Sequence, residues 1–530
     1  MTLIWKRRRV MCGRWTGLAL AALIAVMAPM ASTLAGEDGK PLYETLSPDE
    51  AKALFKKADA KKYNTPFKPN SNPGAQWYPK AGFGLFVHWG IYAQTPLNPS
   101  WSMITDCFGR KRPAKISPEK YYEQAKVFNP KKDAPEMWLE MAKSMRMRYA
   151  VMTTKHHDGY CMWPTKYGKY NTRNYMGGRD LVAEYVKACR KNGLKVGFYF
   201  SPRDWSYNDF KSMFKQPSQH FKWFEKPDWP YKTKAENEKA YEEWLDYTVG
   251  QLSELLTRYG KIDVLWFDGV GWHGISRPED DKRVRNWIYK LQPQIVINPR
   301  WGGKNTNPDY KNHKGKHNLA AISRKIGDFY TFEAKWDDIA KRNEGLYADI
   351  WFEFCKPWKG HWGCVPTNSA EPDPKSVETT IYRLTILRSF GGNFLLNIGP
   401  DKNGELRPDI VSESKIIAAW MEKAHPALVG NDPVKNWESH SNVPLTKRGK
   451  TLYAHLPVGG KQYKPPIKIT GVDKPLEAVV MQTGQKVEFQ YDADKKECVV
   501  VLEQNQLDPM KIGTIVELSF DKEQTLPPKK

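Results

Sequence analysis

The chain has 530 residues, 40% of them hydrophobic, so it can bury one large core and a smaller one, and this excludes a long disordered protein. Its formal net charge of +23 would attract polyanions. The lysines and arginines are nevertheless dispersed along the chain and accompany no nucleic-acid-binding motif, so we expect no nucleic acid partner. The spacing of the seven cysteines fits no zinc motif.

The first 36 residues predict a signal peptide. Five basic residues between Lys6 and Arg14 precede an apolar run from Leu18 to Met30, and a group of small residues ends at Gly36. A membrane anchor is the alternative, but the apolar run is shorter than the roughly 20 residues that a bilayer span needs. We therefore expect a periplasmic or secreted protein with no stable membrane insertion after cleavage. Cleavage would remove five positive charges from +23 and leave +18.

After a polar connector over residues 37–72, apolar runs alternate with helical periodicity over residues 73–432. The strand-like runs are Phe83–Gly90, Tyr149–Tyr160, Leu194–Ser201, Ile262–Gly269 and Gln294–Arg300. The clearest helical segments are Glu136–Met147, Leu181–Asn192 before Gly193, and Glu238–Tyr259 before Gly260. Strand and helix in this repeated alternation predict a (β/α)8-like parallel barrel, in the α/β class.

Several of the strand-like runs end in side chains that can bind or react. The most informative run ends in two adjacent histidines, His156 and His157, in a chain that has only 11 histidines. Other runs end in His88, Asp268 and Arg300. Because the carboxyl ends of barrel strands meet at one rim, we expect these side chains to form a common site.

Six ordered segments carry a resemblance to a known family. They are Phe86–Gly90, Thr153–Tyr160, Leu265–Gly269, Asn298–Gly302, Gly327–Glu333 and Asn393–Pro400. In sequence and in order they resemble the α-L-fucosidases of glycoside hydrolase family 29, and the match runs from about residue 77 to about residue 430. The resemblance implies a barrel enzyme that needs no cofactor and removes terminal α-L-fucosyl groups.

Glycoside cleavage with retention needs a nucleophilic carboxylate and a second carboxyl that donates and then accepts a proton, roughly 5 Å away. Asp268 follows a β-rich run and occupies the nucleophile position of the family motif. Glu333 and Glu353 are the two candidates for the acid/base, and we favour Glu333. The acid/base also needs a raised pKa, which the aromatic neighbours Phe332, Trp336, Trp351 and Phe354 could provide by desolvation.

The remaining candidates would bind the sugar. His88, His156 and His157 can hydrogen-bond hydroxyl groups, and Arg300 can bond ring oxygens or steady the nucleophile. The aromatic rings that can contact the C–H bonds and the methyl group of fucose are Trp89, Trp101, Tyr199 and Trp266. Apolar contact with the methyl group would favour a 6-deoxy sugar only modestly.

Two positions depart from the family pattern. Pro99-Ser100 stands beside Trp101 where many relatives place a glutamate, and Trp362-Gly-Cys364 replaces the usual Trp-Gly-Tyr. Contacts to the outer hydroxyls therefore differ, which leaves fucose, sulfated fucose and related 6-deoxy or galacto-configured sugars open. The expected partner is a fucosylated oligosaccharide or polysaccharide, with sulfated glycans as one option.

Residues 435–525 predict a small β-sandwich, because short strand-like runs are separated by Gly, Pro and Asp/Lys turns. We favour a role in packing against the barrel over independent sugar binding. Two insertions in the barrel, Asp204–Glu236 and Lys304–Arg324, are either specificity loops or surface decoration. Cys355 and Cys364 either pair across their short loop or remain buried thiols.

Two other functions remain as alternatives. A metal-dependent hydrolase could gather His88, His156, His157, Asp158 and Asp268 as ligands at one rim. A secreted carbohydrate-binding homologue could have kept the barrel and lost catalysis. The sequence favours a secreted, retaining exo-α-L-fucosidase that acts by double displacement, and it leaves linkage, aglycone and oligomeric state open.

Overall fold

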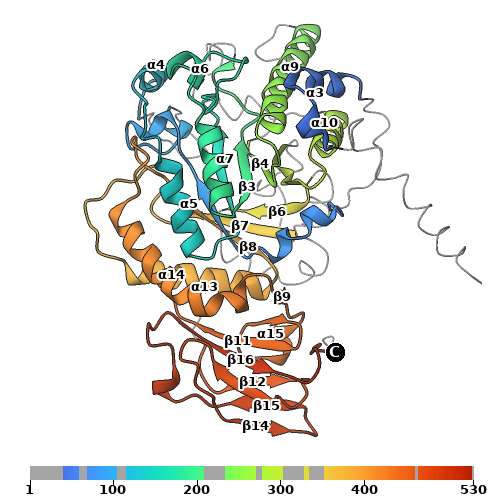
Figure 1. The fold of residues 1–530 in the computed structure, drawn as a ribbon, viewed down its shortest axis with the longest axis vertical. Helices are drawn as coiled ribbons and strands as arrows, with labels where there is room; N and C mark the ends of the chain where they lie inside the picture. The colour runs from blue at the N-terminus through green and yellow to red at the C-terminus, as the bar shows by residue number, and fades with distance from the viewer. Residues whose placement is uncertain are drawn as a thin grey trace, which may run out of the picture.

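Eight parallel strands form the larger unit of the computed structural model, which describes residues 40–58, 69–103, 115–207, 233–269, 277–301, 327–333, 351–459 and 463–527 (Figure 1). The strands are β1 (Phe83–Val87), β2 (Tyr149–Lys155), β3 (Lys195–Phe200), β4 (Val264–Phe267), β5 (Val296–Ile297), β6 (Phe329–Phe332), β7 (Trp351–Pro357) and β8 (Asn393–Ile398). They pair in the order β5-β4-β3-β2-β1-β8-β7-β6. This sheet confirms the predicted barrel.

Side chains alternate between the barrel interior and the helix layer, as the period of two in a strand requires. Phe86, Val151, Tyr199 and Trp266 belong to the interior cluster of buried side chains. Their sequence neighbours join the larger core that lies between the sheet and its helices. The interior also holds Tyr78, from a 3-10 helix that precedes β1, so side chains fill the barrel.

The gap between β5 and β6 is closed by one aspartate rather than by paired strands. The backbone N–H of Asp328 donates to Ile297 O at 2.6 Å, and Asp328 Oδ2 accepts from Ile297 N at 2.8 Å. Asp328 Oδ1 also accepts from Asn70 N at 2.8 Å. The side chain therefore continues the hydrogen bonding at the point where β5, with two residues, is too short to pair.

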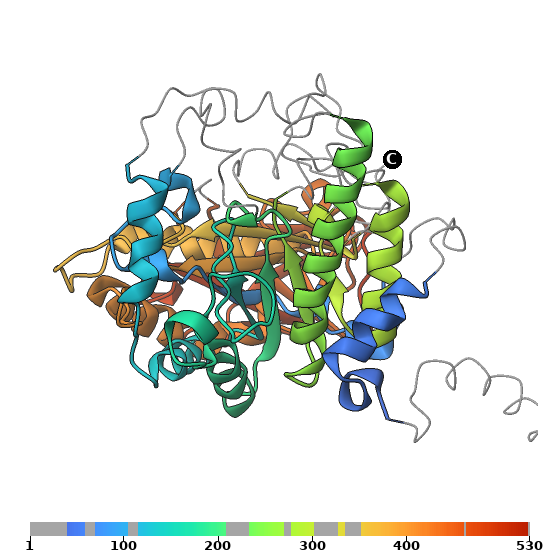
Figure 2. The same ribbon diagram turned by 90° about the horizontal axis from the view of Figure 1, so that it is seen from above.

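The helices surround the sheet when it is seen from above (Figure 2). They are α4 (Pro118–Glu123), α5 (Ala134–Ser144), α6 (Thr172–Tyr175), α7 (Leu181–Lys191), α9 (Lys234–Thr257), α10 (Pro278–Leu291), α13 (Pro374–Ser389) and α14 (Pro408–Leu428). The side chain of Asp180 caps α7 through Ala183 N. Gly193, with φ of +71°, follows the end of this helix and permits its sharp stop.

Part of the predicted connector is helical. Residues 40–58 contain α2 (Leu42–Thr45) and α3 (Pro48–Lys56), and α3 lies beside α9 and α10 in Figures 1 and 2. Phe55 packs edge-on against Trp287 at 5.6 Å, and Lys52 pairs with Asp246 at 2.6 Å. The spacing of Ala51 and Phe55 places both on one helix face, and that face is buried.

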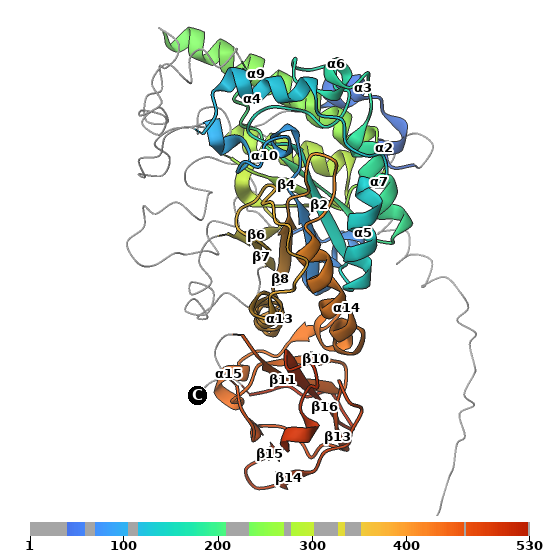
Figure 3. The same cartoon turned by 90° about the vertical axis from the view of Figure 1, so that its left-hand side faces the viewer.

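The C-terminal unit is the predicted β-sandwich. One sheet has five antiparallel strands, β9 (Asp432–Pro433), β10 (Leu445–Arg448), β11 (Thr451–Pro457), β13 (Glu477–Val480) and β16 (Gly513–Ser519). The other has three, β12 (Ile467–Thr470), β14 (Phe489–Asp492) and β15 (Glu497–Val500), and the short helix α15 (Trp437–His440) lies beside it. Helices α13 and α14 lie between this unit and the barrel (Figure 3), and Trp420 Nε1 donates to Gly513 O at 2.8 Å.

Several expectations concern residues outside the described ranges. The signal peptide, Lys304–Arg324, most of Asp204–Glu236, Trp336 and Cys107 lie there. Across the described ranges no helix combines the length and apolar character that a membrane crossing would require. Cys355 and Cys364 are buried free thiols, so the second of the two cysteine alternatives holds for them.

Candidate active site

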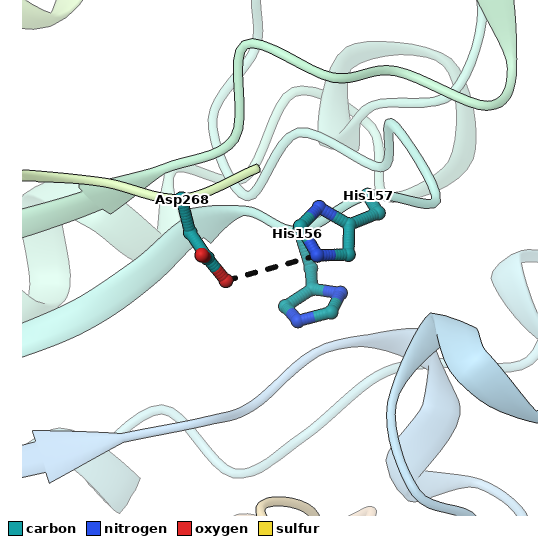
Figure 4. A group of neighbouring side chains, drawn as sticks. All are labelled: His156, His157 and Asp268. Atoms are coloured by element: carbon teal, nitrogen blue, oxygen red, sulfur yellow. Dashed lines mark ion pairs between the residues drawn. The ribbon is translucent and has the colours of Figure 1, made fainter. Parts of the chain in front are cut away.

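The carboxyl ends of the barrel strands bring most of the expected residues together. His88 follows β1, His156 and His157 follow β2, and Asp268 follows β4. The imidazole centroid of His156 lies 5.7 Å from that of His88 and 4.3 Å from that of His157. Figure 4 shows His157 pointing at Asp268, with 3.7 Å between its Nε2 and Asp268 Oδ2.

Asp268 is held by a donor on each side of its carboxylate. Oδ1 accepts from Arg300 Nη1 at 3.1 Å and from Gly269 N at 2.8 Å, and Oδ2 accepts from the Tyr199 hydroxyl at 2.8 Å. Burial disfavours the charged form, but Arg300 above all, followed by the other groups, holds the pKa of Asp268 below its ordinary value. The carboxylate is therefore ionised and oriented, as a nucleophile must be.

Arg300 joins Asp268 to Glu333. Its Nη1 donates to Glu333 Oε2 at 2.8 Å, and its Nε donates to Thr331 Oγ1 at 2.8 Å. Since Nη1 contacts both carboxylates, the two bonded oxygens lie no more than about 6 Å apart. This upper limit lies below the roughly 6.5–9.5 Å of inverting glycosidases and allows the roughly 5 Å of retaining ones.

Glu353 does not reach the rim. It is fully buried in β7, where it pairs in register with Thr331, two residues before Glu333, so it lies one layer deeper in the barrel. Its carboxylate accepts from the hydroxyls of Tyr78 and Tyr149 and, at 2.9 Å, from Trp266 Nε1. Burial raises the pKa of Glu353, whereas these three donors lower it.

The aromatic neighbours expected to desolvate the acid/base lie elsewhere. Phe332 and Phe354 belong to the core between sheet and helices, because they alternate with the inward-facing Glu333 and Glu353. Trp351 packs with Tyr78, 6.1 Å away between ring centroids, in the barrel interior. The desolvation argument was therefore wrong for Phe332 and Phe354.

The three histidines are buried, and their lowered pKa values keep them neutral at pH 7. Desolvation lowers the pKa of His88 to about 4 and that of His157 to about 3, and it lowers the pKa of His156 well below its ordinary value. Each ring is anchored through Nδ1: His88 by Asn397 Oδ1, His156 by Ser100 Oγ and His157 by Ser201 Oγ. Neutral imidazoles can exchange hydrogen bonds with hydroxyl groups without adding positive charge.

These anchors were missed as functional residues in the sequence. Asn397 stands inside a family-like segment, and Ser100 stood out only as a departure from the family pattern. Asn397 is the fifth residue of β8 and faces inward, as Asn393 and Leu395 do. This alternation with a period of two could have indicated from the sequence which way Asn397 points. Ser201 directly follows β3, so it stands at the same kind of strand end as His88 and Asp268.

Of the four expected aromatic residues, three join the site. Tyr199 and Trp266 stack at 5.6 Å between centroids, and the Arg300 guanidinium lies 4.7 Å from the Trp266 ring. Trp101 packs edge-on against His157 at 5.3 Å. Trp362, which was not among the candidates, lies 5.0 Å from His88 and adds a fourth ring to the site.

Trp89 lies outside the site, which corrects the expectation for this residue. Its ring packs edge-on against Trp138 of α5 at 4.9 Å, and its Nε1 donates to Asp401 O at 2.8 Å. Trp89 directly follows His88, and consecutive residues of an extended chain point to opposite sides. Because His88 enters the barrel rim, Trp89 enters the helix layer.

The proposed metal ligands converge only in part. The potential ligand atoms of His156, His157 and Asp268 lie within 4.8 Å of one another. His88 is not in this group, and the carboxylate of Asp158 instead accepts from the Tyr121 hydroxyl and, at 2.9 Å, from Tyr160 N. The five-ligand arrangement is therefore wrong for Asp158, whose role is to hold the turn after β2.

Two carboxylates at this spacing on the rim of a parallel barrel can serve one glycosidic bond, as the catalytic pair of a glycoside hydrolase does. Comparison with known proteins identifies the family to which the chain belongs. The family model described as Alpha-L-fucosidase matches residues 51–425, and the chain belongs to that family of glycoside hydrolases. The resemblance carried by the six segments is thereby confirmed.

Relatives match over most of the chain. The tissue alpha-L-fucosidase of Rattus norvegicus is 26% identical over 458 residues, which cover 82% of this chain and 86% of that protein. Alpha-L-fucosidase isoenzyme 1 from Paenibacillus thiaminolyticus superposes with a TM-score of 0.64 and 30% identity, covering 85% and 99% of the two chains. A GH29 alpha-L-fucosidase from Bacteroides thetaiotaomicron, solved as a trapped covalent intermediate with 2-fluoro-fucosyl fluoride, gives 0.65 and 25%, covering 87% and 99%.

Proposed function

We propose that this chain is an exported exo-α-L-fucosidase that acts with retention, with Asp268 as nucleophile and Glu333 as acid/base. The observation that carries the proposal is the single nitrogen, Arg300 Nη1, that holds both carboxylates. In the first step Asp268 attacks the anomeric carbon while Glu333 gives its proton to the departing oxygen. In the second step Glu333 takes a proton from water, which displaces Asp268 and releases the sugar.

Burial supports Glu333 over Glu353 as the acid/base. Glu333 follows β6 and its side chain is 33% exposed, so it can meet both the glycosidic oxygen and water. Glu353 has no exposed surface, and all three of its donors come from the barrel interior. A proton shuttle needs contact with the leaving group and with solvent, and of these two glutamates only Glu333 has access to both.

The groups around Asp268 support its role as a carboxylate that stays ionised and then leaves. Arg300 and Tyr199 stabilise its negative charge before attack and again when the intermediate breaks down and the carboxylate forms anew. The covalent intermediate trapped in the Bacteroides thetaiotaomicron enzyme supports the same double displacement in this chain.

We propose terminal α-L-fucosyl groups of glycans as the substrate, and sulfated fucose-containing polysaccharides as a second class. The net charge, which is +23 for the chain and +18 without residues 1–36, would attract a sulfated glycan, but charge alone does not choose between the two classes. Matched fucosides with and without sulfate, assayed over a range of ionic strength, separate the two. A sulfate preference that salt abolishes supports the electrostatic argument, and equal rates count against it.

Export is proposed from the sequence of residues 1–36, whose basic start, short apolar run and small residues are typical of a signal peptide. Fractionation of expressing cells, with mass spectrometry of the mature N-terminus, tests it. A chain that stays in the cytoplasm and retains residues 1–36 would contradict export.

The activity itself is tested with an aryl α-L-fucoside. Wild type should turn over, Asp268→Gly should be inactive, and azide should restore the variant and yield β-L-fucosyl azide, because one displacement inverts the anomeric centre. Circular dichroism of the variant controls for folding. An active Asp268→Gly would exclude Asp268 as the nucleophile. A folded wild type that hydrolyses neither the aryl fucoside nor the sulfated and unsulfated fucosides would favour the carbohydrate-binding alternative.

A further inference from the structure

A neutral imidazole has one nitrogen that donates and one that accepts, so whatever bonds to Nδ1 decides what Nε2 offers to a ligand. His88, His156 and His157 are each bonded through Nδ1 and surround the mouth of the barrel. Some of their partners accept a hydrogen bond from Nδ1, and others donate one to it. The hydrogen-bond network therefore assigns a donor or an acceptor to each Nε2.

His88 presents an acceptor. Asn397 Nδ2 donates to the backbone oxygen of Trp362 at 2.8 Å, and this fixes the amide so that its oxygen faces the imidazole. His88 Nδ1, 2.7 Å from Asn397 Oδ1, must then donate. Its Nε2 carries a lone pair.

His157 also presents an acceptor. The hydroxyl proton of Ser201 is committed to the backbone oxygen of Arg203, at 2.7 Å, so Ser201 Oγ can only accept from His157 Nδ1 at 2.6 Å. The free lone pair of Nε2 lies 3.7 Å from Asp268 Oδ2, which is itself an acceptor. A ligand that donates a proton into this gap satisfies both.

His156 has the opposite arrangement because its anchor is Ser100. Ser100 Oγ accepts from Asp158 N at 3.0 Å and lies 2.5 Å from His156 Nδ1, so its hydroxyl proton can go to that nitrogen or to the carboxyl of Asp158, with which Ser100 also interacts. The 2.5 Å contact favours His156 Nδ1 as the acceptor, because the carboxylate of Asp158 already accepts from the Tyr121 hydroxyl and from Tyr160 N. Tyr199 stacks parallel to the ring, with 5.4 Å between centroids, and holds its plane.

We propose that Ser100 is a positioning residue that fixes His156 with its proton on Nε2, as the one donor beside two acceptors. For its effect on turnover this inference rests on the proposed fucosidase function, whereas the tautomer itself does not. The sugar oxygens that meet His88 and His157 must then carry protons, so sulfate at those oxygens is rejected. The oxygen that meets His156 needs only a lone pair.

The tautomer can be read directly by long-range nitrogen–proton NMR of the full chain labelled with ¹⁵N-histidine. Comparison with His156→Gln identifies the signals of His156. In the wild type we expect the pattern of a proton on Nε2 for His156 and on Nδ1 for His88 and His157. A wild-type His156 with its proton on Nδ1 would overturn the proposal, whatever the variants do.

Two serine variants separate positioning from packing. Ser100→Ala should shift His156 toward the other tautomer and raise KM for an aryl α-L-fucoside about tenfold, as expected for one lost hydrogen bond. Ser102→Ala is the matched control, because Ser102 is buried in the same short helix but donates to Asn98 O at 2.7 Å instead of to a histidine. It should leave both the tautomer and KM unchanged.

The outcomes distinguish the two proposals. If no fucoside is hydrolysed but the predicted NMR pattern is present, the proposed function fails and the positioning by Ser100 stands. If fucosides are hydrolysed and Ser100→Ala changes neither the His156 signals nor KM, the function stands and the positioning fails. A shift of the His156 signals in Ser102→Ala as well would also overturn the specific role of Ser100.

Discussion

Trp266 donates its indole proton to Glu353 Oε1 at 2.9 Å, which fixes the orientation of a ring that stands two residues before Asp268 in the chain. The Arg300 guanidinium lies 4.7 Å from the centre of the same ring, and an indole face attracts a cation. The buried glutamate thus acts on the site through tryptophan and arginine, without contact with the sugar. Its removal should affect geometry and stability rather than proton transfer.

This distinction can be measured by chemical rescue of the two glutamates. Glu333→Ala should lose about 10²–10⁴-fold in rate on fucosides with poor leaving groups. Azide should restore it on an activated aryl fucoside and give α-L-fucosyl azide, because azide replaces water in the second displacement.

Glu353→Gln should gain nothing from azide and should unfold at a lower temperature, since the amide nitrogen of Gln cannot accept from the buried donor that faces it. Product analysis by NMR and thermal unfolding followed by circular dichroism provide the two measurements. Formation of α-L-fucosyl azide by Glu353→Gln, and not by Glu333→Ala, would reverse the assignment.

The Tyr199 hydroxyl should set the acidic limit of activity. It donates to Asp268 Oδ2, and a hydrogen bond to a charged group contributes about 1.5–3 kcal/mol. Tyr199→Phe removes a group that lowers the pKa of Asp268, so that pKa should rise. Below it the nucleophile is protonated, and the acid limb of kcat/KM should therefore move to higher pH.

Tyr92→Phe is a suitable control for this shift, because Tyr92 is equally buried but its hydroxyl lies 3.4 Å from Thr153 Oγ1 and not at Asp268. Its acid limb should match that of the wild type. Identical acid limbs for Tyr199→Phe and wild type would show that this hydrogen bond does not control the ionisation of the nucleophile.

Gly269 should be needed for activity because of the space beside it. Its φ is +75°, its N–H faces Asp268 Oδ1, and a Cβ there would lie 3.1 Å from His157 Cε1. Gly269→Ala should cost about 1–2 kcal/mol in backbone strain and should also displace His157, with a clear loss of kcat.

Gly177→Ala separates strain from contact, since Gly177 has φ of +59° and a Cβ added there would meet no atom of the described residues within 4 Å. It should lose similar stability and keep full activity. Equal activity of the two variants would mean that the space beside Asp268 is not critical. Steady-state kinetics and thermal unfolding measure both effects.

Chelators should leave the activity unchanged. His156, His157 and Asp268 lie close enough to hold a cation, but Asp268 is already paired with Arg300, and His157 Nδ1 and His156 Nδ1 are bonded to serines. Dialysis against EDTA, followed by assay with and without added Zn²⁺, measures this. Loss of turnover that Zn²⁺ restores would favour the metal-dependent alternative.

The sequence predicted the barrel because its strong signals are local. Segments such as Leu181–Asn192 have helical periodicity and a glycine stop, and the strand-like runs before His156 and Asp268 are largely apolar. The shortest strand at the edge of the parallel sheet was harder to predict. Strand β5 has only two residues, and a strand this short depends on its partners more than on its own sequence.

The site residues could be predicted only where the sequence shows at which residue a strand ends. Glu353 looked like a rim residue, but β7 continues to Pro357, so the carboxylate is buried at mid-strand. Trp89 was misplaced because a one-residue step reverses the direction of a side chain. Ser100 lies in a 3-10 helix with no periodic pattern, and its contact with His156 spans 56 residues that only the fold brings together.

Asp328 closes the seam between β5 and β6, where no paired strands join the two ends of the sheet. Arg300 emerges on one side of this seam and Glu333 on the other, so the separation of the two carboxylates depends on side chains that bridge it. Local opening there would move the proton donor away from the nucleophile and would release the Ile297 amide to exchange with deuterium. We therefore expect turnover and the protection of the Ile297 amide to be lost together as the temperature rises.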